Sequence, residues 1–225
     1  MTDTRYVLGL DLGQASDPTV AALIEYDVTP LPEYCVRGLH RYPLGSSYPD
    51  IVEDITHRLR QPPLASRTQL AVDATGVGAP VIDLFRKQQP RPAQISAITI
   101  TAGSTVNRNH DDYTVPKTDL ITNTTVLLQK QKIRIAKRLT HRETLANELR
   151  SYRVHINDAG HPTYRPARAS DHDDFVVALS LALWLAEKRP YRPATILISR
   201  RTDQLLPIRG GVYPSRPDDP WLYLP

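Results

Sequence analysis

Cysteine is almost absent from this 225-residue chain, since Cys35 is the only one. A single thiol excludes an internal disulfide and a zinc site built from several thiolates. The sequence also lacks an apolar run long enough to span a bilayer and lacks the basic and apolar regions of a signal peptide. These absences predict an intracellular protein without membrane attachment.

The composition is that of a globular protein, with 40% hydrophobic and 23% charged residues. A chain of this length can bury one substantial core. The net charge of +4 is small and decides nothing alone. It becomes informative if the acidic residues gather in one place, because a positive protein with a local acidic cluster suits a polyanionic substrate that reacts at a metal. Ordinary surface charge is the alternative.

Three carboxylate positions adjoin apolar segments. Asp11 and Asp73 each end a short apolar run, and the acidic cluster at 171–174 opens the most apolar helix predicted. An ionised Asp in such surroundings is costly unless a cation or hydrogen bonds compensate, and oxygen-rich sites suit magnesium or manganese. The local alternatives are a strand-end turn at Asp11, an Asx turn at Asp73 and a favourable charge at a helix N-terminus for Asp174.

The apolar pattern predicts alternating strands and helices, and therefore an α/β fold. Strands are expected at 6–11, 19–26, 34–42, 69–73, 95–101 and, as a short one, 133–135. Helices are expected at 48–60, 79–88, 116–129, 140–151 and 170–188. A capping box of Thr140 and Glu143 is predicted to start the fourth helix. Residues 102–115 are predicted as a polar loop, 152–165 as a hairpin, and the first three strands as an antiparallel meander.

The composition changes after residue 189. The last 36 residues hold many prolines and five arginines. We therefore predict one domain over 1–189 and, over 190–225, an extended tail or a partner-binding segment. A strand at 194–199 is compatible with this interpretation.

Four short motifs, in this order of elements, resemble a known family. They are GLDLG at 9–13, VDATGVG at 72–78, VPKTDL at 115–120 and HDDFVVAL at 172–179. Together they resemble the nuclease domain of the large terminase subunit of tailed bacteriophages, over about residues 6 to 186. The resemblance implies a ribonuclease H-like fold: a mixed five-stranded sheet flanked by helices, here with an added hairpin and a Pro/Arg-rich C-terminal tail.

The resemblance implies a metal-dependent endodeoxyribonuclease. Such an enzyme cuts concatemeric viral DNA during genome packaging in the host cytoplasm, with little sequence specificity. Its cofactors are two divalent ions, Mg²⁺ or Mn²⁺, about 3.5–4 Å apart, of which one activates water and the other stabilises the leaving oxygen. The implied partners are double-stranded DNA and a packaging ATPase domain, a portal or a small terminase subunit.

The resemblance also implies roles for the acidic residues. Asp11, Asp73 and Asp174 are expected to be catalytic metal ligands. Asp173 is a further candidate ligand, but it follows Ser170 by three residues, so a capping box competes with metal binding. Asp171 is a weaker candidate of the same kind.

A second set is expected to bind DNA or to support the site. Lys117 would touch the scissile phosphate or a bound water, or be an ordinary solvated lysine. His172 would orient a ligand, bind phosphate or be a plain first-turn residue. The other candidates for DNA contact are Arg108 and, in the hairpin, Arg153 and Arg165. Gly76 and Gly78 would let backbone approach DNA or merely shape a turn into the next helix.

The chain departs from the family in two respects. It has no Gly-x-x-x-x-Gly-Lys-[Ser/Thr] phosphate loop, so no nucleotide is expected, and it is either an excised nuclease domain or a stand-alone relative. Many relatives, junction resolvases included, carry an acidic residue where this chain has Val177. Asp171 or Asp173 would then have to help hold the second metal.

Three alternatives remain open. A Holliday-junction resolvase of the same fold would act as a dimer on branched DNA. A sugar-kinase or actin-like ATPase shares an Asp-Leu-Gly pattern in its first strand but needs a second related domain. A non-catalytic docking module of a packaging motor would use the acidic residues only structurally.

Overall fold

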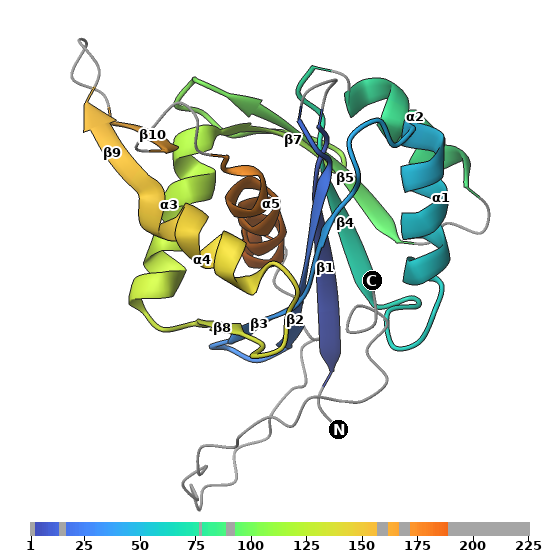
Figure 1. Cartoon of the computed structure of the whole chain (residues 1–225), viewed down its shortest axis with the longest axis horizontal. Coiled ribbons are helices and arrows are strands. Elements are labelled where there is room, and N and C mark those ends of the chain that lie inside the picture. Colours follow the sequence, from blue (N-terminus) through green and yellow to red (C-terminus); the bar gives the residue numbers. More distant parts are fainter. Residues whose placement is uncertain are drawn as a thin grey trace, which may run out of the picture.

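The computed structural model describes residues 3–13, 17–76, 78–88, 93–156, 162–166 and 172–188, with backbone alone for 153–156 and 162–166. In these parts of the chain a mixed β-sheet lies between two layers of helices (Figure 1). Helices α3, α4 and α5 cover one face, and α1 and α2 cover the other.

The elements follow the predicted order, with two additional strands between residues 107 and 116. The strands of the main sheet are β1 (Thr4–Asp11), β2 (Val20–Asp27), β3 (Tyr34–Arg41), β4 (Thr68–Asp73), β5 (Gln94–Thr101), β6 (Asn107–Asn109), β7 (Asp112–Pro116) and β8 (Ile133–Ile135). A separate hairpin is formed by β9 (Tyr152–Ile156) and β10 (Pro162–Pro166). The helices are α1 (Tyr48–Leu59), α2 (Gly78–Lys87), α3 (Lys117–Gln129), α4 (Arg142–Ser151) and α5 (Asp174–Lys188).

The sheet has eight strands, in the order β6-β7-β5-β4-β1-β2-β3-β8, so the prediction of five was too low. The first three strands form the predicted antiparallel meander, while β4 pairs parallel with β1. The predicted loop at 102–115 was wrong, because β6 and β7 form a hairpin at the sheet edge. Every residue of β6 is exposed, so this edge strand has no apolar alternation to reveal it.

Successive residues along the strands face two different hydrophobic cores, one on each side of the sheet. Val7 of β1 faces the core under α5, whereas Leu8 and Leu10 face the core under α1 and α2. A Cβ atom at Gly9 would lie 1.9 Å from the carbonyl oxygen of Ala178 in α5. Only glycine permits this close crossing, and the crossing brings the start of α5 toward the end of β1.

All five predicted helices are present, but the predicted starts of α4 and α5 were too early. Helix α5 begins at Asp174, not at residue 170, and is buried along most of its length. Helix α4 begins at Arg142 after His141, which adopts a left-handed φ of 63° and makes no side-chain cap. The predicted Thr140–Glu143 capping box was therefore wrong.

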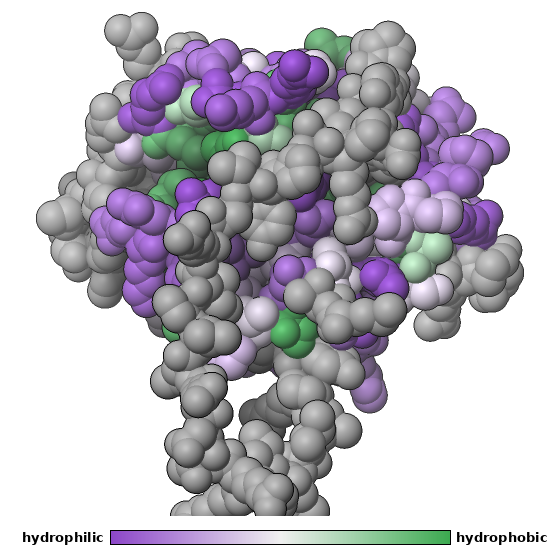
Figure 2. Space-filling model, turned by 90° about the horizontal axis from the view of Figure 1, so that it is seen from below, coloured by the Kyte–Doolittle hydropathy of each residue, from purple (hydrophilic) through white to green (hydrophobic). Residues whose placement is uncertain are grey.

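Among the coloured atoms in the view from below, hydrophilic residues predominate, with hydrophobic ones between them (Figure 2). Leu31 and Leu44, at opposite ends of β3, are among the exposed large hydrophobic residues. Of the helices that the structure describes, none has the length and apolarity needed to cross a bilayer. The predicted tail at 190–225, the strand at 194–199 and the hairpin turn lie outside the described residues.

Candidate metal and nucleic-acid site

The predicted metal ligands converge at one end of the sheet. Leu10 pairs with Val72 in the parallel ladder, so Asp11 and Asp73 end neighbouring strands, about 4.8 Å apart. Both extend rows that face α5, because Gly9 contacts that helix and Ala71 belongs to the core beneath it. Asp174 is the first residue of α5. Strands β1 and β4 and helix α5 thus deliver one carboxylate each.

The charges at this end act strongly on Asp11. Burial raises the pKa of Asp11 well above its usual value, and repulsion from Asp73, Asp174 and Asp173 raises it further. The Lys117 ammonium opposes this and lowers the pKa of Asp11. Four carboxylates and one cation therefore interact electrostatically, which the apolar surroundings strengthen.

Asp73 forms an Asx turn, which the sequence analysis gave as the alternative to a metal-binding role. The Thr75 backbone N–H donates to its Oδ1 atom over 2.8 Å, as in an Asx turn. Burial nevertheless raises the pKa of Asp73, against the opposing effects of Thr75 and Lys117. The turn orients the carboxylate and engages one of its oxygens, so the turn and a ligand role are compatible.

Asp174 has an unsatisfied oxygen. Its Oδ2 atom is buried and makes no hydrogen bond. The nearest cationic groups are His172 Nδ1 at 3.8 Å and Arg41 Nη2 at 3.9 Å, both beyond hydrogen-bond range. Burial raises the pKa of Asp174, and His172 and Arg41 partly offset this. An orphaned buried carboxylate oxygen suits a group that binds there.

Asp173 is engaged differently from the other three carboxylates. Its Oδ2 atom accepts hydrogen bonds from Lys117 Nζ at 2.8 Å and from the Tyr152 hydroxyl at 2.6 Å. It precedes α5, and its backbone carbonyl accepts the Val177 N–H at 2.8 Å. The capping-box interpretation was wrong, because Asp173 stands before the helix, not in its first turn.

The start of α5 is capped by Glu148 of α4, a residue that the sequence analysis missed. Its Oε2 atom accepts the backbone N–H groups of Phe175 at 3.0 Å and Val176 at 3.1 Å. Burial raises the pKa of Glu148 to about 7. Its Oε1 atom is buried without a hydrogen bond. A sequence signal existed, because Glu148 shares the buried stripe of α4 with Leu145 at helical spacing.

Tyr152 and Arg41 were also missed. Tyr152 follows Glu148 by four residues and reaches Asp173, and burial raises the pKa of its hydroxyl. Arg41 is placed by register alone: it pairs with Val20, which pairs with Asp11. Its guanidinium lies 5.0 Å from the Phe175 ring and 3.7 Å from Glu148 Oε1. No local pattern around Arg41 signals this position.

The two glycines of the predicted set shape the turn after β4. Gly76 has a left-handed φ of 69°, which suits glycine. A Cβ atom at Gly78 would lie 2.5 Å from the carbonyl oxygen of Asp73. Both residues therefore let α2 start directly against the end of β4, in agreement with the turn interpretation.

Of the predicted DNA-contacting arginines, Arg108 stands apart from the carboxylates. Arg108 is exposed and donates to the His110 carbonyl at 2.7 Å. Through Tyr113 and Ile98 it stands in the row of Asp73, three strands and about 14 Å away. Arg153 and Arg165 are paired positions of the hairpin, but their side chains lie outside the description, as does Asp171.

Asp11, Asp73 and Asp174 carry the type of ligand atom that a divalent cation prefers, but their side chains are not arranged around a common point. Among the described residues, no three acidic, histidine or cysteine side chains are grouped closely enough to hold a metal as they stand. The donors are nevertheless hard carboxylate oxygens, and Asp174 Oδ2 is buried without a partner. A cation at the centre would require the side chains of Asp11, Asp73 and Asp174 to turn toward it, and it would relieve their repulsion.

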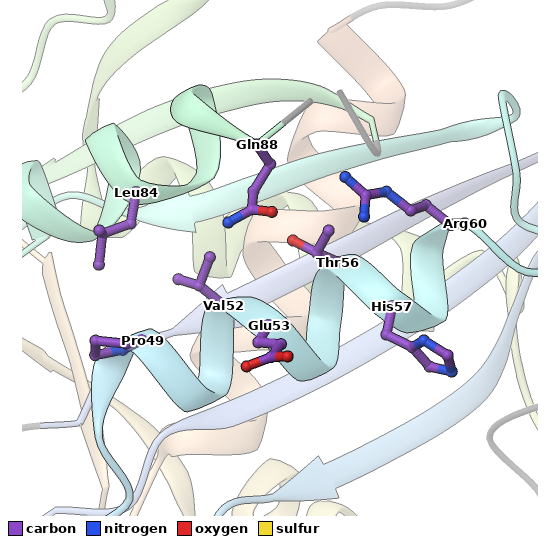
Figure 3. A pocket seen from close by; sticks show the side chains of 8 residues that line it. All are labelled: Pro49, Val52, Glu53, Thr56, His57, Arg60, Leu84 and Gln88. Carbon is purple, nitrogen blue, oxygen red and sulfur yellow. The ribbon is translucent and has the colours of Figure 1, made fainter. Parts of the chain in front are cut away.

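A separate hollow of about 460 Å³ lies between α1 and α2 (Figure 3). Its walls include Val52, Thr56 and Leu84, and Glu53 is the one carboxylate among its lining residues. These helices cover the face of the sheet opposite α5. The hollow is therefore separate from the carboxylates.

The architecture is the ribonuclease H-like fold of terminase nuclease domains, which confirms the predicted resemblance at the level of fold. The large terminase nuclease from thermophilic phage G20c with bound magnesium matches with a TM-score of 0.57 and 22% identity, over 81% of this chain and 82% of that one. The large terminase nuclease domain of Thermus phage P74-26 matches with a TM-score of 0.52 and 21% identity, over 80% and 78%.

The large terminase of bacteriophage HK97 matches with a TM-score of 0.52 and 12% identity, over 81% of this chain and 39% of that one. No protein-family model and no curated protein matches the chain. At these identities the likeness to solved structures establishes the fold.

Proposed function

We propose that this chain is a metal-dependent DNA endonuclease of terminase type, which cuts concatemeric viral DNA during genome packaging. The observation that carries the proposal is the convergence of Asp11, Asp73 and Asp174 from β1, β4 and α5, with mutual repulsion at one sheet end. The fold is shared with a phage nuclease crystallised with magnesium. A phosphodiester hydrolase needs such carboxylates to hold divalent ions beside its anionic substrate.

Asp11, Asp73 and Asp174 would hold two Mg²⁺ or Mn²⁺ ions. When bound, these ions would activate a water molecule and stabilise the leaving oxygen. That Asp173 is a further ligand stays a prediction. Its contacts with Lys117 and Tyr152 favour another role, in which it anchors the lysine beside the metal ligands.

The remaining side chains orient the site. Lys117 offsets the charge of Asp11 and Asp73, and its ammonium has further N–H donors for a substrate phosphate. Tyr152 and Asp173 fix that ammonium. Glu148 fixes the first turn of α5, and hence the position of Asp174.

We further propose that double-stranded DNA contacts Lys117, Arg108 and the hairpin arginines Arg153 and Arg165, with little sequence specificity. A packaging ATPase domain, a portal or a small terminase subunit would position that DNA in the host cytoplasm. The exposed Arg108 and the paired positions of Arg153 and Arg165 support this part of the proposal.

The test is plasmid cleavage by the purified chain with manganese, with magnesium and with EDTA, beside the Asp11→Ala protein. We expect metal-dependent cutting that the substitution abolishes. A four-way junction tested in parallel separates a packaging nuclease from a resolvase, which would prefer the branched substrate. A folded chain that cuts neither substrate with either metal would contradict the proposal for the isolated chain and favour a docking module.

A further inference from the structure

A second hollow adjoins the carboxylates on the side of Arg41. It has a volume of about 380 Å³, and its lining residues are Pro18, Arg41, Tyr42, Pro43, Leu44, His141 and His172. Arg41 is in register with Asp11 through Val20. Two strand spacings separate them, or about 10 Å. The hollow therefore lies beside the proposed metal site, at the same end of the sheet.

The cationic side of the hollow is incompletely used. Arg41 Nε is buried and makes no hydrogen bond. Its Nη2 atom stands 3.7 Å from Glu148 and 3.9 Å from Asp174, so the guanidinium attracts both carboxylates without a short hydrogen bond to either. Packing over the Phe175 ring holds it there. A planar guanidinium so placed is suited to a phosphate group.

Two histidines add hydrogen-bonding groups to the lining beside Arg41. Burial and the neighbouring Arg41 lower the pKa of His141, which favours its neutral form. The side chain of His172 is 58% exposed, with its Nδ1 atom 3.8 Å from Asp174. The ring of His141 lies 5.2 Å from that of Phe175. Imidazole N–H groups donate to anionic oxygens whether or not the ring is charged.

The lining of the hollow also includes apolar residues, among them Pro18, Pro43 and Leu44. Leu44 is 62% exposed, although leucine is a residue that folding normally buries. Tyr42 is fixed by a hydrogen bond from its hydroxyl to Asp54, at 2.7 Å. A lining that combines a guanidinium, imidazoles and apolar side chains matches a nucleotide, which joins a charged phosphate to an apolar sugar and base face.

We propose that this hollow binds a phosphodiester group of the DNA, next to the phosphodiester group that is cleaved. Arg41 and His172 hold the phosphate, and Leu44 with Pro43 contacts the adjoining sugar or base. The proposal rests on the proposed nuclease function for the identity of its ligand. The carboxylates of Asp174 and Glu148 oppose the phosphate, and the Arg41 guanidinium between them offsets part of their charge without metal.

The test measures DNA binding without metal, so that it is separate from catalysis. A fluorescein-labelled 20-base-pair duplex is titrated in EDTA, and its anisotropy gives Kd. The key pair is Leu44→Glu and Leu31→Glu, which add the same charge at two exposed leucines. We expect Leu44→Glu to weaken binding about tenfold relative to Leu31→Glu, because it adds a negative charge to the lining of the hollow.

Two substitutions address the donors, with Arg134→Gln as the matched control. Arg41→Gln is expected to lower the slope of log K against log salt by about one, as the loss of one phosphate contact does. His172→Gln is expected to weaken binding by a smaller factor. If removal of Arg41 unfolds the protein, the exposed Leu44 and His172 still provide the test.

The outcomes separate the two proposals. Equal Kd values for Leu44→Glu and Leu31→Glu overturn the subsite, even if the chain cuts DNA with manganese. Weaker binding by Leu44→Glu supports the subsite, even if cutting is absent and the proposed nuclease activity fails.

Discussion

Two arginines near opposite ends of β3 lie in contrasting surroundings. At one end Arg41 stands between the buried Glu148 and the half-buried Asp174, and its Nε atom has no hydrogen bond. At the other end Arg134 of β8, in register with Cys35, pairs with Glu33 at 3.3 Å. Both members of that second pair are well exposed, at 65% and 45%.

The contrast indicates which end of β3 carries destabilising interactions. An exposed ion pair contributes little because water screens it. Charged groups whose buried atoms lack hydrogen bonds are costly. The end of β1 collects three such atoms: Asp174 Oδ2, Glu148 Oε1 and Arg41 Nε. Local rules tend to be broken at functional sites, so this end is where binding of an ion or a substrate would restore the missing interactions.

The largest expected effect comes from removing the proposed metal ligands. Asp73→Ala and Asp174→Ala should each lower manganese-dependent cleavage by about 10⁴-fold or more, as loss of a central catalytic group does. The melting temperature in EDTA should stay equal or rise, because mutual repulsion is reduced. Cleavage assays and thermal denaturation of the same preparations measure both. Full activity of Asp73→Ala would falsify the site assignment.

A smaller effect is expected from the network around Asp173. Lys117→Met and Tyr152→Phe should each reduce kcat by about 10- to 100-fold, as loss of groups that orient a metal site does. Because both donors meet at Asp173 Oδ2, the double variant should lose less than the product of the two single losses. Steady-state cleavage kinetics of the four proteins measure this. Strictly multiplicative losses would mean that the two side chains act independently.

The sequence predicted the fold where patterns are local. Apolar alternation located β1 to β5, and it identified the carboxylates that end β1 and β4. It missed β6, because a fully exposed edge strand has no buried face to impose alternation. It missed β7 although Tyr113 and Val115 alternate as buried residues, because that pattern covers only five residues. It also placed the start of α5 too early, because Ser170 and Asp173 match a capping box that the helix does not use.

The parts of the site that were missed depend on long-range pairing. Glu148 caps a helix that begins 26 residues later in the chain, and Arg41 reaches Asp174 only because β3 lies two strands from β1. No spacing along the chain encodes either contact. Asp11, Asp73 and Asp174 were identified because an acidic residue beside an apolar run is itself a local anomaly.

The buried carboxylate of Glu148 predicts how the stability of the folded protein depends on pH. Burial raises its pKa from 4.5 to about 7, so the folded state holds a proton that the unfolded state releases. Stability should therefore increase as the pH falls from about 7 toward 4.5, and should be lost as the pH rises through 7. The contribution is at most about 3 kcal/mol.

Urea denaturation in EDTA at pH 5 and pH 8 tests this, with Glu148→Gln as the comparison. The amide cannot titrate, so the variant should show a smaller stability difference between the two pH values. Subtracting the two proteins removes the contributions of the other carboxylates. Equal differences for both proteins would show that Glu148 keeps its ordinary pKa.

The smallest effect is expected at the opposite end of β3. Arg134→Gln and Glu33→Gln should each change the free energy of unfolding by no more than about 0.5 kcal/mol, because their exposed pair is screened. Neither should change DNA cleavage. Denaturation and cleavage assays beside Glu148→Gln compare the two ends directly. A loss of activity in Arg134→Gln would contradict the contrast between the two ends of β3. It would show that DNA cleavage also depends on the charge of the exposed Arg134–Glu33 pair.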